Sequence, residues 1–116
     1  METMMTKENI KTKFLIETIE WGKAIAVGDK KKANKLHKKI QDLYNKAKEL
    51  NHTNVFSELL SEPDESVRLW AATFTLNLFP DLAERTLEDL SELTSITGLS
   101  AETTLDLWRQ GMLDLV

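Results

Sequence analysis

The amino-acid sequence predicts an all-α fold of about six short helices. Apolar residues recur at steps of three and four along most of the 116-residue chain, which is the spacing of one helix face. No stretch alternates apolar and polar residues with a period of two, and the β-branched residues are scattered. Because the turns between the expected helices are short, we expect antiparallel helical hairpins stacked side by side.

Two long helices are expected in the first half of the chain. The first runs from about Glu8 to Val27, and Gly28 follows where a helix C-terminal glycine belongs. Asp29 can cap the second helix through its side-chain oxygen. This second helix has the clearest helical spacing of apolar residues, at Ala33, Leu36, Ile40, Leu43, Ala47 and Leu50.

Four shorter helices are expected in the second half. Thr53 can cap a short helix that Pro63 terminates, and Asp64 can cap the next one. The helix after Asp64 is apolar around much of its circumference, so we expect it at the centre of the fold. Pro80 suits the first turn of a fifth helix, and Ser100 can cap a sixth.

Length and composition predict one compact domain spanning residues 1–116. The apolar fraction of 41% and the charged fraction of 29% are close to globular averages and argue against a disordered chain. The absence of cysteine excludes disulfides, thiolate metal sites and a cysteine nucleophile. The first 21 residues have no apolar signal-peptide core and no apolar run reaches membrane-spanning length, so we expect a cytoplasmic protein.

The two halves of the sequence carry opposite charge. Residues 1–52 contain 12 lysines and seven acidic residues, whereas residues 53–116 contain three arginines and 12 acidic residues. The formal charges are therefore +5 and −9. We expect a basic N-terminal helical hairpin over 1–52 and an acidic helical part over 53–113.

Part of the second half resembles a known repeat. The stretch LLSEPDESVRLWAA, from Leu59 to Ala72, resembles the turn and second helix of a HEAT repeat, with a leucine pair, a turn containing Asp64, then Val67-Arg68 and small residues. Extended over residues 53–113, the pattern is similar to a small uncharacterised bacterial family of HEAT/armadillo-like helical-repeat domains. The resemblance implies an α-α superhelix and no particular activity.

Motifs that carry chemistry are scarce. His37 and His52 are too far apart in sequence to form a local metal pair, and Glu49-x-x-His52 lacks the second such unit that di-iron bundles require. No glycine-rich phosphate loop or serine nucleophile elbow is present. Adjacent carboxylates such as Glu88 and Asp89 point in different directions on a helix. We therefore expect no enzymatic activity, no metal and no cofactor.

An acidic surface on the expected fifth helix is the leading candidate for function. One face of a helical stack can bind a partner, and an acidic face suits a basic protein. The hypothesis is a non-enzymatic protein-interaction domain, with a bacterial immunity or adaptor protein as its most concrete form, that is a monomer or weak homodimer and has no membrane partner. The expected contact residues are Glu84, Glu88, Asp89 and Glu92.

A lysine stripe on the second helix supports an alternative function. Lys31, Lys35, Lys38 and Lys39 share a face and could bind nucleic-acid phosphates without reading sequence. This segment has no arginine and only Tyr44 as an aromatic residue. It therefore has few side chains that could form hydrogen bonds with nucleic-acid bases or stack on them. A solvated face, or a face that pairs with the acidic half, also accounts for the stripe.

The three tryptophans lie at positions with helical spacing, which is typical of core residues. We expect Trp70 in the core most clearly, and Trp108 near the C-terminus to be the most exposed of the three.

Overall fold

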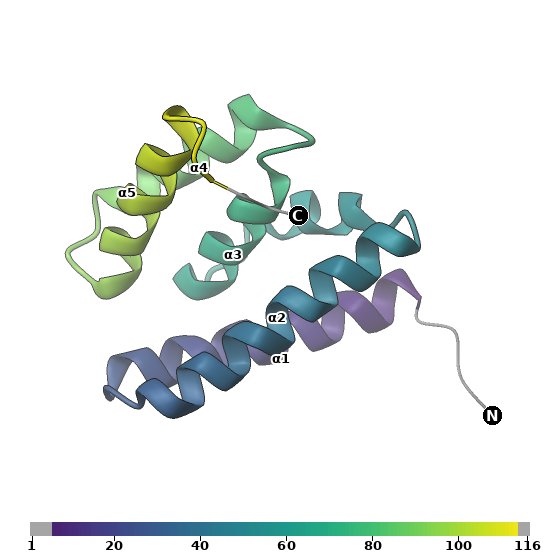
Figure 1. Ribbon diagram of the computed structural model, residues 1–116, viewed down its shortest axis with the longest axis horizontal. Helices are drawn as coiled ribbons and strands as arrows, with labels where there is room; N and C mark the ends of the chain where they lie inside the picture. Colours follow the sequence, from purple (N-terminus) through teal and green to yellow (C-terminus); the bar gives the residue numbers. More distant parts are fainter. Residues whose placement is uncertain (1–5, 114–116) are drawn as a thin grey trace.

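The computed structural model describes residues 6–113 and folds them into five α-helices and one 3₁₀ helix, which confirms the predicted all-α class. The helices are α1 (Lys7–Ala26), α2 (Lys30–Glu49), η1 (Thr53–Leu59), α3 (Glu65–Thr75), α4 (Pro80–Ser91) and α5 (Ile96–Arg109). The long α1–α2 hairpin lies along one side, and α3, α4 and α5 lie over it (Figure 1). None of the helices described has the length and apolar character needed to cross a membrane.

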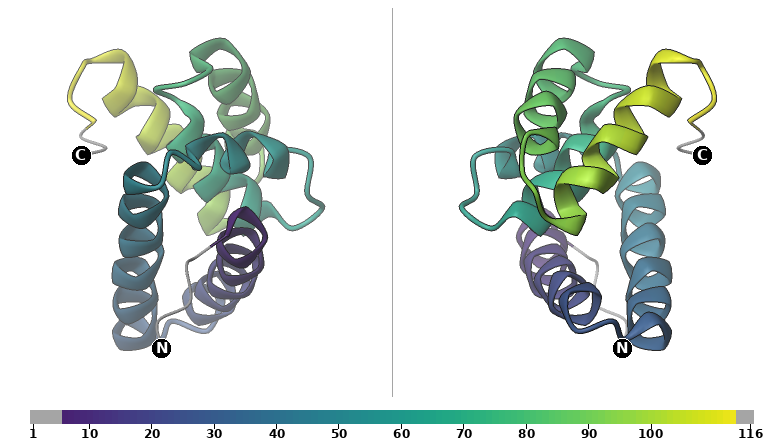
Figure 2. Two further views of the ribbon diagram at one scale, coloured as in Figure 1. Left: turned by 90° about the vertical axis from the view of Figure 1, so that its right-hand side faces the viewer. Right: turned by 90° about the vertical axis from the view of Figure 1, so that its left-hand side faces the viewer.

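The helix α3 is central, as its all-round apolar sequence predicts. It packs against α1, η1, α4 and α5. In Figure 2 the helices of the α1–α2 hairpin are closest at their connecting turn and diverge away from it, and η1 lies across the open end. Because α3 has helices on several sides, eight of its 11 residues are buried.

Side-chain caps begin two helices where the sequence predicts them. A carboxylate oxygen of Asp29 accepts a hydrogen bond from the backbone N–H of Lys32 at 3.1 Å. A carboxylate oxygen of Asp64 accepts from the N–H groups of Ser66 and Val67 at 2.8 and 3.2 Å. These bonds satisfy donors that the first turn of a helix cannot pair within itself.

The third helix differs from its prediction. It is a 3₁₀ helix rather than an α-helix, and no side chain caps it. Thr53 is its first residue and not its cap, and His52 precedes it. The segment is one of the short connectors in which 3₁₀ geometry is common.

The last helix also begins earlier than predicted, because Ser95 caps it and Ser100 lies inside it. The side-chain oxygen of Ser95 accepts from the N–H of Gly98 at 3.3 Å. Gly98 is buried, and a Cβ atom there would overlap the carbonyl oxygen of Leu93. A glycine in the first turn therefore allows α5 to start directly against the end of α4.

A cluster of aromatic rings joins the hairpin to the rest of the protein. The ring of Phe74 stacks on Tyr44 with centroids 4.3 Å apart. Its centroid also lies 5.2 Å from that of Phe56 and 6.1 Å from that of Phe14. These four rings come from α3, α2, η1 and α1, so one cluster fastens four helices together.

The tryptophans follow the expected order of burial. Trp21 and Trp70 are each 7% exposed, and their rings meet edge to face at 5.4 Å between centroids. Trp108 is only partly buried and packs at the edge of the core.

The helices α1 and α3 approach closely at Gly22. A Cβ atom at this position would overlap the hydroxyl of Ser66 and lie 3.0 Å from its Cβ. Gly22 lies inside α1, where glycine has a poor helix propensity. Its presence is therefore explained by packing rather than by local conformation.

We expect Gly22→Ala to lower the free energy of unfolding by about 1–3 kcal/mol through overpacking, although Ala is favoured by about 1 kcal/mol in an open helix. Urea unfolding followed by circular dichroism measures the change. In a Ser66→Ala background the loss should be smaller, because the overlapping hydroxyl is absent. A stabilised Gly22→Ala protein would contradict the close approach.

Candidate functional surfaces

The four acidic residues expected to bind a partner lie on α4 and at its C-terminal end, in two different settings. The side chain of Glu84 is 28% exposed and that of Glu88 is 56% exposed, and both contact α5. Asp89 and Glu92 are exposed to solvent. The predicted surface therefore divides into a pair of glutamates bound to the next helix and a pair that is free of it.

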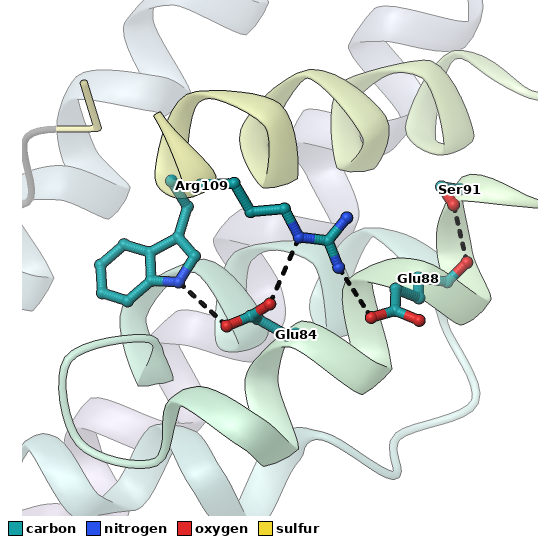
Figure 3. A network of polar contacts seen from close by, with 5 residues as sticks. Glu84, Glu88, Ser91 and Arg109 are labelled. Atoms are coloured by element: carbon teal, nitrogen blue, oxygen red, sulfur yellow. Dashed lines mark hydrogen bonds and ion pairs between the residues drawn. The ribbon is translucent and has the colours of Figure 1, made fainter. Parts of the chain in front are cut away.

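The glutamate pair fastens α5 to α4 (Figure 3). The indole Nε1 of Trp108 donates a hydrogen bond to Glu84 Oε2 at 3.2 Å, and Arg109 Nε donates to Glu84 Oε1 at 3.4 Å. Arg109 Nη2 donates to Glu88 Oε1 at 2.9 Å. The sequence does not predict this network, because its members lie 21 to 25 residues apart. We call these four residues the α4–α5 latch.

The remaining acidic residues form an exposed strip on α4. Asp81, Asp89 and Glu92 are exposed and make no ion pair within residues 6–113. Arg85 is also exposed on this helix, so the strip is interrupted by one cation. This acidic strip is open to a basic partner.

The predicted lysine stripe lies on the outer side of α2. Lys31, Lys35, Lys38 and Lys39 are all exposed, and none makes an ion pair within the described part of the chain. The neighbouring Lys32 differs, because it pairs with Glu20 at 3.6 Å. The four lysines thus form a positive surface whose charges are available to an anion.

A lysine of this stripe affects the pKa of one carboxyl group on α1. Partial burial raises the pKa of Glu17, while the positive charges of Lys39 and Lys13 act against that rise. Lys39, at the edge of the stripe, therefore has a carboxyl group nearby.

The opposite charges of the two halves stay largely separate. Within residues 6–113, one ion pair joins the hairpin to the later helices, between Lys11 Nζ and Glu58 Oε1 at 3.4 Å. The other ion pairs lie within one half or the other. The fold therefore keeps a basic side and an acidic side.

A cavity of 330 Å³ lies where α1, α2, α3 and α5 meet. Its walls combine the rings of Trp21 and Trp70 with polar groups, among them His37, Gln41 and Ser100. The His37 ring meets Trp70 edge to face, with centroids 4.9 Å apart. Sequence reasoning missed this site, because spacing along the chain identifies Trp70 only as a core residue.

Trp70 also has a buried polar atom, which is closed off from the cavity. Its indole Nε1 is buried and has no hydrogen-bond partner among the described residues. Leaving a buried donor unpaired costs about 1–3 kcal/mol, so such groups in folded proteins call for an explanation.

A second cavity, of 350 Å³, is lined by residues of α1, of α2 and of the turn between them, and by Ile96 of α5. Lys30 and Asn34 of α2 line it on one side, and Ile96 of α5 lines it on the other. The same side of α2 then supplies His37 and Gln41 to the first cavity.

Residues 6–113 contain no cluster of three histidine, aspartate or glutamate side chains that could hold a metal ion. The surface features of residues 6–113 are the acidic strip, the lysine stripe and the two cavities.

The fold and these surfaces define a small all-α domain built of helical hairpins, with charges segregated to two sides. The sequence matches a domain of unknown function, DUF2019, over residues 8–108, and the chain belongs to this family. The structure is similar to the crystal structure of the protein RPA1889 from Rhodopseudomonas palustris CGA009, with a TM-score of 0.85 and 24% identity over 95% of this chain and 93% of that chain. This likeness shows a shared fold. No curated protein matched the sequence.

The α4–α5 latch predicts different effects for its two glutamates. We expect Glu84→Ala to lower the free energy of unfolding by about 1–3 kcal/mol, because it removes two hydrogen bonds to a half-buried carboxylate. Glu88→Ala should cost about 0–1 kcal/mol, because it breaks one exposed ion pair. Urea unfolding monitored by tryptophan fluorescence compares them, and equal losses would show that Glu84 has no special structural role.

Proposed function

We propose that this chain is a non-enzymatic protein-interaction domain that binds a basic partner protein through the acidic strip of α4. The observation that supports this most is the exposed negative charge of Asp81, Asp89 and Glu92, none of which makes an ion pair within residues 6–113, on a helix that the α4–α5 latch joins to α5. A surface of one sign attracts a partner of the opposite sign over several ångströms and speeds their encounter.

The arrangement of the second half supports the same proposal. The helices α3, α4 and α5 pack each on the next, in the manner expected of HEAT-like helical repeats. Repeats of this kind present a continuous outer surface while their inner faces form the core. In its most concrete form, the proposal is an immunity or adaptor protein that neutralises a cationic protein in a bacterial cell.

The latch changes which of the sequence-predicted residues are best placed for this contact. Glu84 is engaged on two sides by α5, so its primary role is to position that helix. Glu88 shares one oxygen with Arg109, and its side chain is still more than half exposed. Asp89 and Glu92 therefore provide the cleanest test, because their replacement leaves the latch intact.

We expect the double variant Asp89→Lys/Glu92→Lys to lose the partner while unfolding at nearly the same urea concentration as the unchanged protein. The measurement is a pull-down from nuclease-treated lysate of the source cells, with captured proteins quantified by mass spectrometry. The matched control is Asp42→Lys/Glu49→Lys, which changes net charge equally on exposed positions of α2. Equal capture by both double variants would refute the acidic strip as the binding surface.

A nucleic-acid-binding function is the second candidate, and the unpaired lysine stripe of α2 is the observation that favours it. Lysines that contact phosphates release counterions, so the affinity falls steeply as salt rises. No aromatic residue accompanies the stripe on its exposed side, because Tyr44 is buried in the core. Any binding would therefore be independent of base sequence.

For this second candidate, we expect Lys31→Gln and Lys35→Gln each to reduce the slope of log affinity against log salt by about one. Fluorescence anisotropy with a labelled DNA duplex at several salt concentrations measures the slope. An affinity that does not change with salt would exclude the stripe as a phosphate-binding surface.

A further inference from the structure

We propose that this chain forms a homodimer through the end of the molecule at which the α1–α2 turn and the α4–α5 turn lie side by side. The occupant of this surface is a second copy of the chain, related to the first by a two-fold axis. The interface uses no residue of the acidic strip, so it is separate from the protein-interaction proposal. Two features support it: exposed apolar side chains beside open hollows, and opposite charges on the two sides of the surface.

The two turns meet around Ile96. Both turns lie on the left of Figure 1, and that side faces the viewer in the right-hand view of Figure 2. Ile96 lines the second cavity, whose other lining residues all belong to residues 24–34. It also lines an open hollow of 340 Å³, whose other lining residues all belong to residues 91–102. Ile96 therefore stands between two hollows, at the middle of a surface formed by residues 23–34 and 91–102, which we call the end face.

The end face exposes large apolar side chains. Leu99 is 64% exposed and Ile96 is 51% exposed, and Leu93 and Val27 are exposed as well. These four are nearly half of the nine large apolar residues that are exposed within residues 6–113. Exposed apolar side chains that gather in one place mark interaction sites, whereas single scattered ones do not. The concentration of four at one end therefore indicates a contact with another molecule.

The two hollows give these side chains a place to pack in a second copy. The second cavity and the open hollow have volumes of 350 and 340 Å³, and each is lined partly by apolar groups, such as Ala24 and Ile25 in the former and Leu93 in the latter. In a two-fold dimer the same patch of both copies forms the contact. A patch with protruding side chains next to hollows can therefore pack on a copy of itself.

The two sides of the end face carry opposite charge. Residues 23–34 contain four lysines and one aspartate, which gives +3, whereas residues 91–102 contain two glutamates and no cation, which gives −2. Lys30 lines the second cavity and Glu102 lines the open hollow, and neither makes an ion pair within residues 6–113. Asp29 also lines the second cavity, and its carboxylate accepts the N–H of Lys32 as the cap of α2.

This distribution of charge favours a second copy over a different partner. A partner of one charge sign would be attracted by one side of the end face and repelled by the other. A two-fold axis that passes beside Ile96, in the plane of the face, brings the basic side of each copy against the acidic side of the other. Lys30 of one copy then faces Glu102 of the second, and the same pairing occurs twice.

The size of the end face predicts a reversible dimer. Stable interfaces use about 20–30 residues from each partner, which is more than the two short segments of the end face provide. We therefore expect a dimer that dissociates on dilution.

The first experiment is sedimentation velocity on the full chain at concentrations from about 1 to about 500 μM, the range in which weak complexes form and dissociate. We expect the average mass to rise from that of one chain toward that of two. A mass of one chain at every concentration would overturn the proposal, whatever else binds the end face. A mass that rises beyond two chains would overturn the two-fold arrangement.

The second experiment locates the interface. Leu99→Ser shortens an exposed side chain of the end face, and Leu82→Ser makes the same change at an exposed position of α4 outside it. We expect the dissociation constant to rise at least about tenfold for Leu99→Ser, because each dimer loses two apolar contacts, and to stay the same for Leu82→Ser. Equal constants for the two variants would refute the end face as the interface.

The third experiment tests the pairing across the axis. Lys30→Glu and Glu102→Lys each place like charges opposite one another, so each should raise the dissociation constant about tenfold. The double variant Lys30→Glu/Glu102→Lys restores opposite charges and should return to within about threefold of the unchanged protein. Asp42→Lys, at an exposed position of α2 outside the end face, is the control for the change in net charge. A double variant that dimerises no better than the single ones would refute the two-fold pairing.

Discussion

The packing of aromatic rings around Phe74 is the contact on which the rest of this structure depends. Rings from α1, α2, η1 and α3 meet there, and every one of them is buried. Truncating one such ring in a core costs about 3–5 kcal/mol, a large share of the stability of a small domain. Apolar burial, and not charge attraction, therefore holds the basic hairpin against the acidic helices.

Because apolar packing joins the two halves, the charged side chains remain available to bind partners. If ion pairs held the two halves together, the lysines of α2 and the carboxylates of α4 would be paired with each other inside the protein. The structure joins the halves with one exposed pair, Lys11 and Glu58, and such a pair contributes little to stability. The lysines of the stripe and the carboxylates of the acidic strip are exposed to solvent, where they can attract partners of opposite sign.

The way the helices pack on one another accounts for both the α4–α5 latch and the cavity that Trp70 lines. Because α4 and α5 form an antiparallel pair, Glu84 and Glu88 meet Trp108 and Arg109, which fixes the position of α5. Because α3 packs between α5 and the hairpin, a cavity remains between α2 and α5, and aromatic side chains of α3 line it.

The sequence by itself determined the all-α class, the two long helices, the caps at Asp29 and Asp64 and the segregation of charge, because these follow from spacing and from contacts within one helical turn. It misplaced the start of the last helix, because Ser100 was expected to cap it, whereas Ser95 caps it and Gly98 permits close contact with the end of α4. Only the tertiary structure decided which carboxylates of α4 are engaged, and that Trp70 lines a cavity together with residues of α1, α2 and α5. Those features join residues more than 20 positions apart, and their meeting depends on how α3 packs between the two halves.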